Sequence, residues 1–562
     1  MILQPIIDLV AICAKKGIKN VILSPGSRCA PLTLAFARHP EIHARTISDE
    51  RSAAFIAMGM AQQLDEPVVL VCTSGSAALN YFPAVAEAFF QNIPLLILTA
   101  DRPPEWIDQW DGQTIFQPEV YGKHVKGSFQ FPDSYSHPDQ IAWASRISNE
   151  AINLSQSFPK GPVHINIPLR EPFYPSENEK FQFPENPKIT HLCSSNIELS
   201  SESKIQLLSQ LKDQKRILIL AGQQNPNPEI QVLLDKISKE KNVVVITDTI
   251  SNMQSEETIN LHDHFVGNED LNLELNPDLI ISFGKSIISK PLKLFLREAN
   301  AVHWHIQEDG KGKDVFQSLS QLVPASPEDF LSWFLEHISS QEESYYARWH
   351  DLNCQTDQLL ETAFQELEFG EFSALKTVLS YVPKSSKIHV ANSMSVRYLN
   401  QLGARTQEIY CNRGTSGIDG SNSTAVGCTF TTKDPVTLIT GDLAFFYDRN
   451  AFWHNYSMPN LRIILLNNHA GGIFRMIDGP KKQPELEEYF ETKQALTAES
   501  LAKDFHFNYT KVSDQKSLTE ALQDFYSPSI HPKILEIESE SSLNEQQLKK
   551  LKGVIKSELG EN

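Results

Sequence analysis

The sequence predicts an α/β protein of three successive open domains, each built on a mainly parallel sheet. Short apolar segments alternate with segments of helical length, which is typical of βαβ units. This alternation is interrupted by a segment rich in Pro, Ser, Asn and Glu (175–200) and by a charged helical segment (339–372). The length of 562 residues also favours about three domains of ordinary size. We expect these domains at residues 1–180, 195–340 and 350–562.

Four strands are predicted in the first domain, over residues 21–23, 44–47, 68–72 and 95–98. Helices follow the first three strands and are expected to end near residues 39, 60 and 90. A polar cluster comes after each strand, namely SPGSR (24–28), DER (49–51), TSGS (73–76) and ADRPP (100–104). Ligands of open parallel sheets lie beyond the carboxyl ends of the strands. The clusters therefore predict a binding site along one edge of this sheet.

The same alternation predicts the sheets of the other two domains. Strands of the second domain are expected at 216–220, 243–246, 279–281 and 302–306. Strands of the third domain are expected at 388–390, 436–440, 461–466 and 534–537. The chain ends in a polar helical segment, 544–559, which we expect to be a solvated surface helix.

The composition disfavours several classes of function. The formal net charge of −19 argues against a nucleic-acid-binding surface, because phosphates need cationic partners. No segment approaches the ~20 consecutive apolar residues of a membrane-spanning helix, and the first residues lack the cationic start of a secretory signal. The seven cysteines are scattered without a Cys-x-x-Cys pair, which disfavours a zinc site or a disulfide framework. We therefore expect a cytoplasmic protein.

The strongest local pattern lies in the third domain, where two neighbouring strands end in polar residues. Gly441-Asp442 follows the strand at 436–440, and Asn467-Asn468 follows the strand at 461–466. A carboxylate and a carboxamide offer oxygen ligands of the kind that Mg²⁺ prefers, and bound Mg²⁺ usually contacts substrate phosphates. A glycine at 441 would let the backbone approach such a phosphate closely.

Arginines also gather at the predicted strand ends of this acidic chain. They are Arg28, Arg102, Arg397 and Arg413. Arginine binds carboxylates through two parallel hydrogen bonds, although a single surface arginine more often forms an ion pair of small energy. Four of them at the expected functional edges of two sheets predict substrates that carry several carboxylates.

The Gly-Asp and Asn-Asn pairs at this spacing resemble the diphosphate motif of thiamine diphosphate enzymes. Glu50 matches the family's glutamate after the second strand of the pyrimidine-binding domain, which hydrogen-bonds the aminopyrimidine of the cofactor. Without the motif, an acid at this helix start would be read as a partner of the helix dipole. The resemblance implies a pyrimidine-binding, a central α/β and a diphosphate-binding domain. It also implies thiamine diphosphate with Mg²⁺ or Mn²⁺ as cofactors.

Longer strings resemble one branch of this family, the synthases of menaquinone biosynthesis that make 2-succinyl-5-enolpyruvyl-6-hydroxy-3-cyclohexene-1-carboxylate (SEPHCHC). The strings are SPGSR (24–28), DER (49–51), TSGSAALNYFPAVAEA (73–88), LTADRPPE (98–105), NRGTSGIDG (412–420), GDLAFFYD (441–448) and NNHAGGIF (467–474). The middle domain resembles the branch only loosely. The resemblance implies a transferase that decarboxylates 2-oxoglutarate and adds the remaining succinyl unit to isochorismate. It also implies a homodimer or homotetramer with the site between chains.

The resemblance further implies a role for each matching residue. Glu50 activates the cofactor, and Ile418 separates the two cofactor rings. The metal ligands are Asp442, Asn468 and the backbone carbonyl of Ala470. Further cofactor contacts come from Ser393, Gly441, Leu443, Gly471, Ile473 and Phe474. The substrate-binding residues are Ser27, Arg28, Arg102, Gln113, Lys290, Ser393, Arg397, Arg413, Ile473 and Phe474, and Arg28, Arg102, Gln113, Arg397 and Arg413 are expected to act in catalysis with Glu50.

The chain departs from the pattern of the branch at three positions. Gly112 precedes Gln113 where an asparagine is frequent, and Ala470 stands where a glycine is expected. Pro291 follows Lys290 where a second cation is frequent, and Lys285 and Lys293 lie nearby as alternatives to Lys290.

Two other functions stay open at this point. An acetolactate synthase-like enzyme or another 2-oxoacid decarboxylase would share the cofactor but would have little use for four arginines. A non-catalytic subunit could share the fold, because fold alone does not determine function. The presence of Glu50 together with Asp442 and Asn468 argues against such a subunit.

Overall fold

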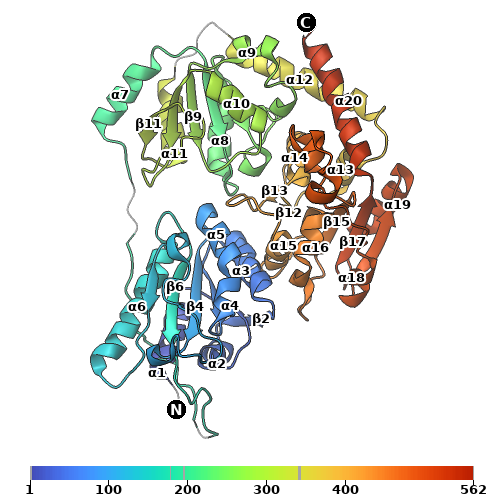
Figure 1. The fold of residues 1–562 in the computed structure, drawn as a ribbon. Coiled ribbons are helices and arrows are strands. Elements are labelled where there is room, and N and C mark those ends of the chain that lie inside the picture. Colours follow the sequence, from blue (N-terminus) through green and yellow to red (C-terminus); the bar gives the residue numbers. More distant parts are fainter. Residues whose placement is uncertain (1–2, 178, 194–196, 339–343, 561–562) are drawn as a thin grey trace.

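The computed structural model describes residues 3–177, 179–193, 197–338 and 344–560. Three sheets follow one another along the chain, and the strand pairs within each of them are parallel (Figure 1). The central strands are buried along most of their length, as expected of parallel sheets covered on both faces. This arrangement confirms the predicted fold class.

The first sheet has the strand order β2-β1-β3-β4-β6-β5. Its strands are β1 (Asn20–Leu23), β2 (His43–Thr46), β3 (Val68–Cys72), β4 (Leu95–Asp101), β5 (Ser128–Gln130) and β6 (Val163–Pro168). The associated helices are α1 (Gln4–Lys15), α2 (Ala30–Arg38), α3 (Glu50–Leu64), α4 (Ser76–Asn80), α5 (Phe82–Gln91) and α6 (Pro138–Gln156). The four predicted strands correspond to β1, β2, β3 and β4.

The second sheet has the order β11-β10-β9-β7-β8. Its strands are β7 (Ile217–Ala221), β8 (Val243–Thr247), β9 (Leu279–Phe283), β10 (Val302–Ile306) and β11 (Leu319–Val323). The helices of this part are α7 (Ser201–Leu211), α8 (Pro228–Ile237), α9 (Glu269–Leu275), α10 (Lys290–Glu298) and α11 (Pro327–His337). Strand β8 lies on one side of β7, and β9 and the strands that follow it lie on the other side. The topological switch point is therefore between β7 and β9.

The third sheet has the order β13-β12-β14-β15-β17-β16. Its strands are β12 (Lys387–Val390), β13 (Glu408–Tyr410), β14 (Val436–Gly441), β15 (Leu461–Asn467), β16 (Asn508–Val512) and β17 (Lys533–Glu538). The helices are α12 (Tyr345–Phe364), α13 (Glu371–Tyr381), α14 (Met394–Asn400), α15 (Ser421–Thr429), α16 (Asp442–Tyr447), α17 (Ile473–Met476), α18 (Glu499–Asp504), α19 (Gln515–Phe525) and α20 (Ser541–Gly560). The predicted helical segment at 339–372 corresponds to α12 and the start of α13, and its residues 339–343 lie outside the described part of the chain.

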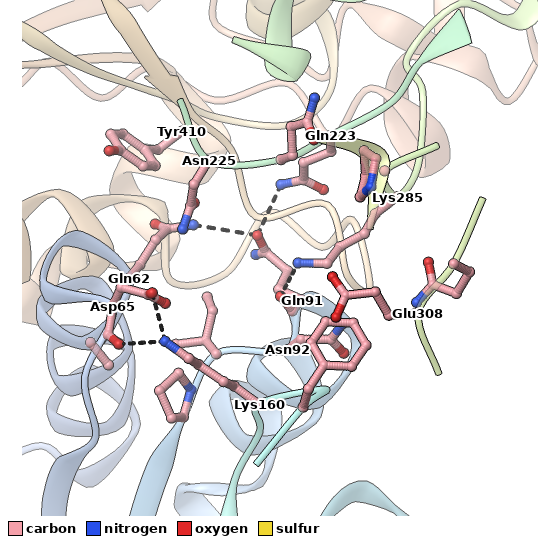
Figure 2. A pocket seen from close by; sticks show the side chains of 18 of the residues that line it. Gln62, Asp65, Gln91, Asn92, Lys160, Gln223, Asn225, Lys285, Glu308 and Tyr410 are labelled. Atoms are coloured by element: carbon pink, nitrogen blue, oxygen red, sulfur yellow. Dashed lines mark hydrogen bonds and ion pairs between the residues drawn. The ribbon is translucent and has the colours of Figure 1, made fainter. Parts of the chain in front are cut away.

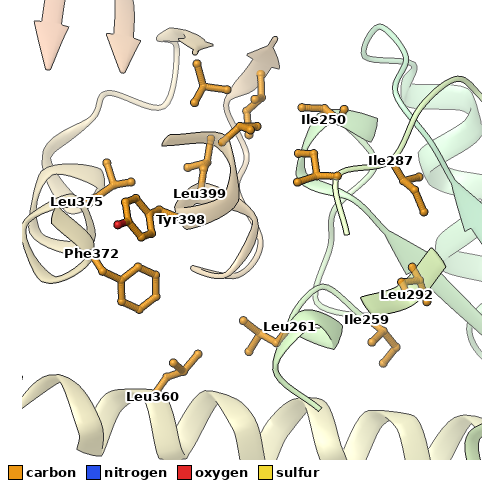
Figure 3. Close-up of a cluster of buried hydrophobic side chains, with 14 of the residues drawn as sticks. Ile250, Ile259, Leu261, Ile287, Leu292, Leu360, Phe372, Leu375, Tyr398 and Leu399 are labelled. Atoms are coloured by element: carbon orange, nitrogen blue, oxygen red, sulfur yellow. The ribbon is translucent and has the colours of Figure 1, made fainter. Parts of the chain in front are cut away.

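The third domain shares an apolar core with each of the other two. One cluster joins α3 and α5 of the first domain to α15, β14 and β15. A second cluster joins the middle sheet to the third sheet, and Figure 3 shows Ile250, Leu261 and Leu292 of the middle domain on one side of it and Phe372 and Leu399 of the third domain on the other. These shared cores hold the carboxyl edges of the sheets in fixed relation to one another.

The expectation of a solvated C-terminal helix is wrong. Helix α20 packs along α12 and buries Leu548, Leu551, Ile555 and Leu559 in the core that the middle and third domains share. These leucines and the isoleucine recur at intervals of three and four residues, which places them on one face of a helix. The charged residues between them cover only the opposite face.

The segment at 175–200 contains no helix or strand among its described residues, in agreement with the predicted linker. Its first part lies on the first domain, where Phe181, Phe183 and Ile189 pack against the core. Asn149 of α6 donates a hydrogen bond to the carbonyl of Lys188. Among the described helices, none combines the length and apolarity that a bilayer crossing requires.

Candidate active site

The register of the third sheet brings the two predicted metal-binding side chains together. Gly441 pairs with Leu466 across β14 and β15, so Asp442 and Asn468 follow the carboxyl ends of adjacent strands. Asp442 is buried, and its Oδ2 accepts a hydrogen bond of 2.7 Å from the amide of Gln494. The Asn468 Oδ1 accepts a hydrogen bond of 3.0 Å from the backbone N–H of Ala470, which turns this loop back towards the sheet.

A second buried acid lies beside this pair and was not predicted. Glu371, the first residue of α13, accepts a hydrogen bond of 2.8 Å from the Asn468 amide. Burial raises the pKa of Glu371 to about 7, and the nearby Asp442 charge adds to this effect. Burial likewise raises the pKa of Asp442 to about 6. Neither carboxylate forms an ion pair within the described residues, so a bound cation would relieve their repulsion.

Gln494 is the other residue at this edge that sequence patterns did not reveal. It donates to Asp442 and, at 3.3 Å, to the Oδ1 of Asn467, and its backbone N–H donates to the carbonyl of His469. It therefore connects the ends of β14 and β15 to the loop that contains Gln494, between α17 and α18. Its local sequence carries no motif that would have indicated this role.

Glu50 begins α3 beyond the carboxyl end of β2, as predicted. The preceding Asp49 caps the helix by accepting hydrogen bonds from the N–H groups of Arg51 and Ser52. Asp49 also accepts a 2.7 Å bond from the Asn450 amide, which fixes the start of α3 against the third domain. The Glu50 carboxylate itself is half-buried and has no hydrogen-bond or ion-pair partner among the described residues.

The four predicted arginines form two pairs, one on each of two domains. In the first domain, Arg28 is buried and donates to the carbonyl of Leu169, and its guanidinium stacks on the Phe173 ring. Burial and the neighbouring Arg102 charge lower the pKa of Arg28. Arg102 is held by an ion pair with Asp111.

The second pair consists of Arg397 on α14 and Arg413 after β13. Burial and the Arg413 charge lower the pKa of Arg397. Arg397 donates a hydrogen bond to the carbonyl of Ser393, the residue next to Asn392, to which Arg413 donates. Arg413 donates a hydrogen bond of 2.9 Å to the Oδ1 of Asn392, and its Nε is buried without a partner among the described residues. Two cations held side by side, with an unused donor, form a site for an anion.

Several residues in the loops of the predicted site adopt backbone conformations that residues other than glycine rarely take. Gln113, Ser393 and His469 have φ values of 57°, 75° and 59°. Such strain costs about 1–3 kcal/mol for each residue and concentrates at functional sites. The backbone of Gln113 lies against Gly75, where an added Cβ would come within 3.1 Å of it. These loops are therefore held in strained positions by their surroundings.

The remaining predicted residues lie at the same two edges with different degrees of exposure. Ser27 is exposed at the end of β1, and Ile418 is exposed in the turn before α15. Leu443 on α16 and Gly471, Ile473 and Phe474 around α17 are half-buried. They line the loops on either side of Asp442 and Asn468.

Lys290 and Lys293 of α10 in the middle domain differ in burial and in the charges that surround them. Lys290 is exposed at the start of α10 and its charge acts on Asp478. Lys293 is half-buried one turn further along, where burial and the charges of Arg413 and Arg397 lower its pKa. The sequence placed both lysines near the site, but only the packing of α10 distinguishes them.

Comparison with known proteins gives matches over nearly the whole chain. The family model "Thiamine pyrophosphate enzyme, N-terminal TPP binding domain" matches residues 8–125. The model "Middle domain of thiamine pyrophosphate" matches residues 191–390, and "Thiamine pyrophosphate enzyme, C-terminal TPP binding domain" matches residues 392–537. The first of these ranges contains β1 to β4 of the first sheet, and the last contains β13 to β16 of the third sheet.

Curated relatives are similar over their full length. A protein of Cytophaga hutchinsonii is 46% identical, with 98% of this chain and 99% of the relative covered. A protein of Christiangramia forsetii is 39% identical with 98% of each chain covered, and one of Porphyromonas gingivalis is 36% identical with 93% and 92% covered. All three are named 2-succinyl-5-enolpyruvyl-6-hydroxy-3-cyclohexene-1-carboxylate synthase. The chain therefore belongs to the thiamine pyrophosphate-dependent enzymes and, within them, to the family of the SEPHCHC synthases.

Proposed function

We propose that the protein decarboxylates 2-oxoglutarate and joins the remaining succinyl unit to isochorismate, which gives SEPHCHC and CO₂ in menaquinone biosynthesis. In this reaction the bond between C1 and C2 of the oxoacid breaks, and a new carbon–carbon bond forms to the ring alkene of isochorismate, whose neighbouring carbon takes up a proton. The observation that carries the proposal is the presence of two arginine pairs beyond the strand ends, Arg28 with Arg102 and Arg397 with Arg413. Both substrates carry two carboxylates, so two sites for anions are needed.

The residues at the ends of β14 and β15 fit a divalent cation and a diphosphate. Asp442, Asn468 and the carbonyl of Ala470 would bind Mg²⁺ or Mn²⁺, since hard cations prefer oxygen ligands. Gly441 and Gly471 leave the backbone accessible beside them, and Ser393, Leu443, Ile473 and Phe474 surround the same loops. When bound, thiamine diphosphate supplies the carbanion chemistry that decarboxylation of a 2-oxoacid needs.

Glu50 would hold a proton against the aminopyrimidine of the cofactor. Its carboxylate has no partner in the part of the chain that the structure describes, and the Asp49 cap fixes its backbone at the start of α3. A side chain with these properties can accept and return a proton without first breaking an internal hydrogen bond. Ile418, exposed in its turn, is suited to contact the face of a cofactor ring.

The arginine pairs would bind and orient the substrates. Arg397 and Arg413, with Lys293 or Lys290 from the middle domain and Ser393, would bind the carboxylates of one substrate. Arg28 and Arg102, with Ser27 and Gln113, would bind those of the other. A fixed geometry of this kind lowers the barrier by bringing the reacting carbons together in the correct orientation.

We propose a homodimer or homotetramer in which the first domain of one chain faces the third domain of another. Large apolar side chains lie exposed near the predicted site on both domains: Trp110 is 100% and Phe116 is 75% exposed in the loop that carries Gln113, and Trp453 is 55% exposed. Exposed aromatic groups of this size are typical of interaction surfaces. We further propose domain limits at 1–180, 195–340 and 350–562, and a cytoplasmic location, in keeping with seven free cysteines.

The proposal is tested by a coupled assay with thiamine diphosphate and Mg²⁺ that follows isochorismate loss and CO₂ release from 2-oxoglutarate. We expect turnover that needs both substrates and falls about 10²–10⁴-fold in Glu50→Gln, because the variant cannot exchange a proton. The exposed Glu229→Gln on α8 is the matched control and should keep full activity. CO₂ release from pyruvate without consumption of isochorismate would retain the cofactor assignment and exclude this synthase activity.

A further inference from the structure

Buried carboxamides connect separate parts of this molecule at two places. Where the first and middle domains meet, Gln91 accepts hydrogen bonds from the amides of Gln62 at 3.4 Å and Gln223 at 2.9 Å (Figure 2). The other place lies inside the first domain, near the carboxyl ends of β4 and β6, where Asn166 and Gln117 are fully buried. This second group adjoins the arginine pair of the first domain.

One face of β4 changes from apolar to polar towards the carboxyl end of the strand. Leu95 and Ile97 belong to the core shared with the third domain. Thr99 and Asp101 continue the same face, since alternate residues of a strand point to the same side. The neighbouring strand β6 contributes Asn166, which pairs in register with Thr99. This polar row of Thr99, Asp101 and Asn166 therefore lies at the edge of the sheet where ligands bind.

Asn166 uses the full hydrogen-bonding capacity of its carboxamide. Its Oδ1 accepts from the Thr99 hydroxyl at 3.0 Å and from the Gln117 amide at 2.9 Å. Its Nδ2 donates to the Asp101 Oδ2 at 2.8 Å and to the Gln130 Oε1 at 3.1 Å. A carboxamide has two donor hydrogens and two acceptor lone pairs, so no group is left unused. The reversed orientation would place Oδ1 against the Asp101 carboxylate.

His164 on β6 extends the polar row and fixes the direction of its bonds. Burial lowers the pKa of His164 to about 3, so the imidazole is neutral and carries one N–H. The single hydroxyl hydrogen of Thr99 goes to Asn166, so the His164 Nε2, 2.8 Å from that hydroxyl, carries the N–H and donates it. The Nδ1 then accepts from the Ser128 hydroxyl at 3.1 Å. A buried network in which every donor meets an acceptor holds a single geometry.

Asp101 connects the polar row to both arginines of the first domain. Its carboxylate accepts a hydrogen bond of 2.7 Å from the backbone N–H of Arg102. Burial raises the pKa of Asp101, whereas the hydrogen bond from Asn166 and the charges of Arg28 and Arg102 lower it. A carboxylate beside two guanidinium groups offsets part of their mutual repulsion, which keeps the arginine pair together before a substrate anion binds.

Gln117 connects the polar row to the end of the loop 102–117, which follows β4. Its amide also donates to the carbonyl of Ala100 at 2.9 Å, and its Oε1 accepts from the N–H of Gly75 at 3.1 Å. The backbone of Gln113 packs on the same glycine, where an added Cβ would come within 3.1 Å of it. The polar row therefore holds the loop at its start through Asp101 and at its end through Gln117.

We propose that Asn166 and Asp101 act as a positioning pair for the substrate site of the first domain. Neither side chain would contact the substrate. Asn166 orients the Asp101 carboxylate and the Gln117 amide, and these fix the loop on both sides of the site. Arg102 and Gln113 are thereby held where they can bind a substrate carboxylate, a role that rests on the proposed function. Such binding depends on placement, because a guanidinium grips a carboxylate through two parallel hydrogen bonds.

The pair is tested by exchanging its two chemical groups. Asn166→Asp keeps the size of the side chain but places a second acceptor against Asp101, so the contact should break and the loop should loosen. We expect KM of the holoenzyme for one of the two substrates to rise about 10–100-fold while kcat changes less than about threefold. Adding Asp101→Asn to this variant restores a donor opposite an acceptor, and should bring that KM back to within about threefold of the wild type.

Hydrogen–deuterium exchange of residues 103–118 gives a readout that needs no turnover. Exchange in this loop should be faster in Asn166→Asp and should return to the wild-type rate in the double variant. Asn149→Asp is the matched control, because Asn149 is 2% exposed in the same domain and likewise donates two hydrogen bonds, to the carbonyls of Ser145 and Lys188. It should lower the melting temperature without changing either KM or the exchange of the loop.

Gln117→Met removes the anchor at the other end of the loop and serves where Asn166→Asp does not fold. It should raise the same KM. An unchanged KM in a folded Asn166→Asp or Gln117→Met, or a double variant no better than Asn166→Asp, would overturn the inference. If the wild type consumed no isochorismate, the proposed function would fail, and the exchange measurement would then decide alone whether the pair holds the loop.

Discussion

At the scale of single residues, Asn392 connects the predicted substrate and cofactor loops. It is 3% exposed and donates hydrogen bonds of 2.6 and 2.7 Å to the carbonyls of Asn412 and Gly417. Its Oδ1 accepts the bond from Arg413. One side chain after β12 therefore positions both an arginine of the second pair and the turn that carries Ile418.

Asn392→Ala should raise KM for 2-oxoglutarate and lower kcat/KM about 10–100-fold, because Arg413 and the turn lose their common anchor. Steady-state kinetics of the variant would measure both KM for 2-oxoglutarate and kcat/KM. Asn508→Ala, which removes an exposed asparagine of the same domain, is the control. Unchanged kinetics with a lowered melting temperature would instead assign Asn392 a structural role only.

Site residues that directly follow a predicted strand could be identified from the sequence. Residues that reach the same edge from other loops and helices could not. Asp442, Asn468 and the arginines could be placed because a parallel sheet collects its strand ends at one edge. Gln494 lies 52 positions from Asp442 with no motif around it, and Glu371 begins a helix. Their proximity depends on how loops and helices pack, which local patterns do not encode.

At the scale of elements, helices α3 and α15 approach each other through glycines. A Cβ added at Gly59 would lie 2.1 Å from the carbonyl oxygen of Thr424, and one at Gly427 would lie 2.1 Å from that of Ile56. The obstacle is backbone in both cases, so neither clash can be relieved by a side-chain rotation. This contact joins the first and third domains.

Gly59→Ala should destabilise the protein by about 1–3 kcal/mol, since the helices must separate to admit the methyl group. Gly553→Ala on α20 is the matched control, because open space surrounds that position and alanine favours a helix by about 1 kcal/mol over glycine. Urea unfolding monitored by circular dichroism would compare the unfolding free energies of the two variants with that of the wild type. A Gly59→Ala midpoint equal to or above that of the wild type would contradict this account of the packing.

Asp448 links the end of α16 to the start of α15 and introduces a dependence of stability on pH. Its carboxylate accepts bonds of 2.7 and 2.8 Å from the backbone N–H and hydroxyl of Ser423, yet burial raises its pKa to about 7 from an ordinary value of 3.8. The folded state therefore holds this proton more strongly than the unfolded state. The stabilisation that comes from this stronger proton binding is fully present below about pH 4 and is lost as the pH rises through about 7.

Asp448→Asn should flatten this dependence, because an amide can keep both contacts with Ser423 without ionising. Between pH 5 and 8 we expect the wild type to lose about 2–3 kcal/mol of unfolding free energy relative to the variant. Unfolding free energies measured across this range would show the difference, with the exposed Asp213→Asn as control. If the free energies of unfolding of the wild type and of Asp448→Asn changed equally with pH, Asp448 would not be the source of the pH dependence.

Most buried strands were predicted from their apolar runs, whereas the edge strands β5, β11, β13 and β16 and the buried strand β6 were not. Strands β3, β4, β14 and β15 are buried and matched the predicted positions closely. The three-residue strands β5 and β13 are too short to give a pattern. The apolar residues of α20 recur at helical spacing, but the many charged residues of this segment led to the wrong prediction of a solvated surface helix.

At the scale of the whole molecule, the two halves of the predicted site lie on different domains. Glu50, at the start of α3, and the pair Arg28 and Arg102 belong to the first domain, whereas Asp442, at the start of α16, and Arg397, on α14, belong to the third. Figure 1 shows α3 in the first domain and α14 and α16 in the third. The aromatic side chains exposed near both halves leave surface that another chain can cover. A site completed between chains, as proposed, would explain why the Glu50 carboxylate has no hydrogen-bond or ion-pair partner among the described residues of its own chain.

Coexpression of Glu50→Gln and Asp442→Ala chains tests this arrangement directly. If each site takes Glu50 from one chain and Asp442 from another, a mixed dimer holds one fully intact site, although each variant alone is inactive. Random pairing makes about half of the dimers mixed, so about a quarter of the wild-type activity should return. Coexpression of two differently tagged Glu50→Gln chains is the control and should give no recovery. If both residues instead served the same site within one chain, every site in the mixture would lack one of them, and activity would stay at the level of the single variants.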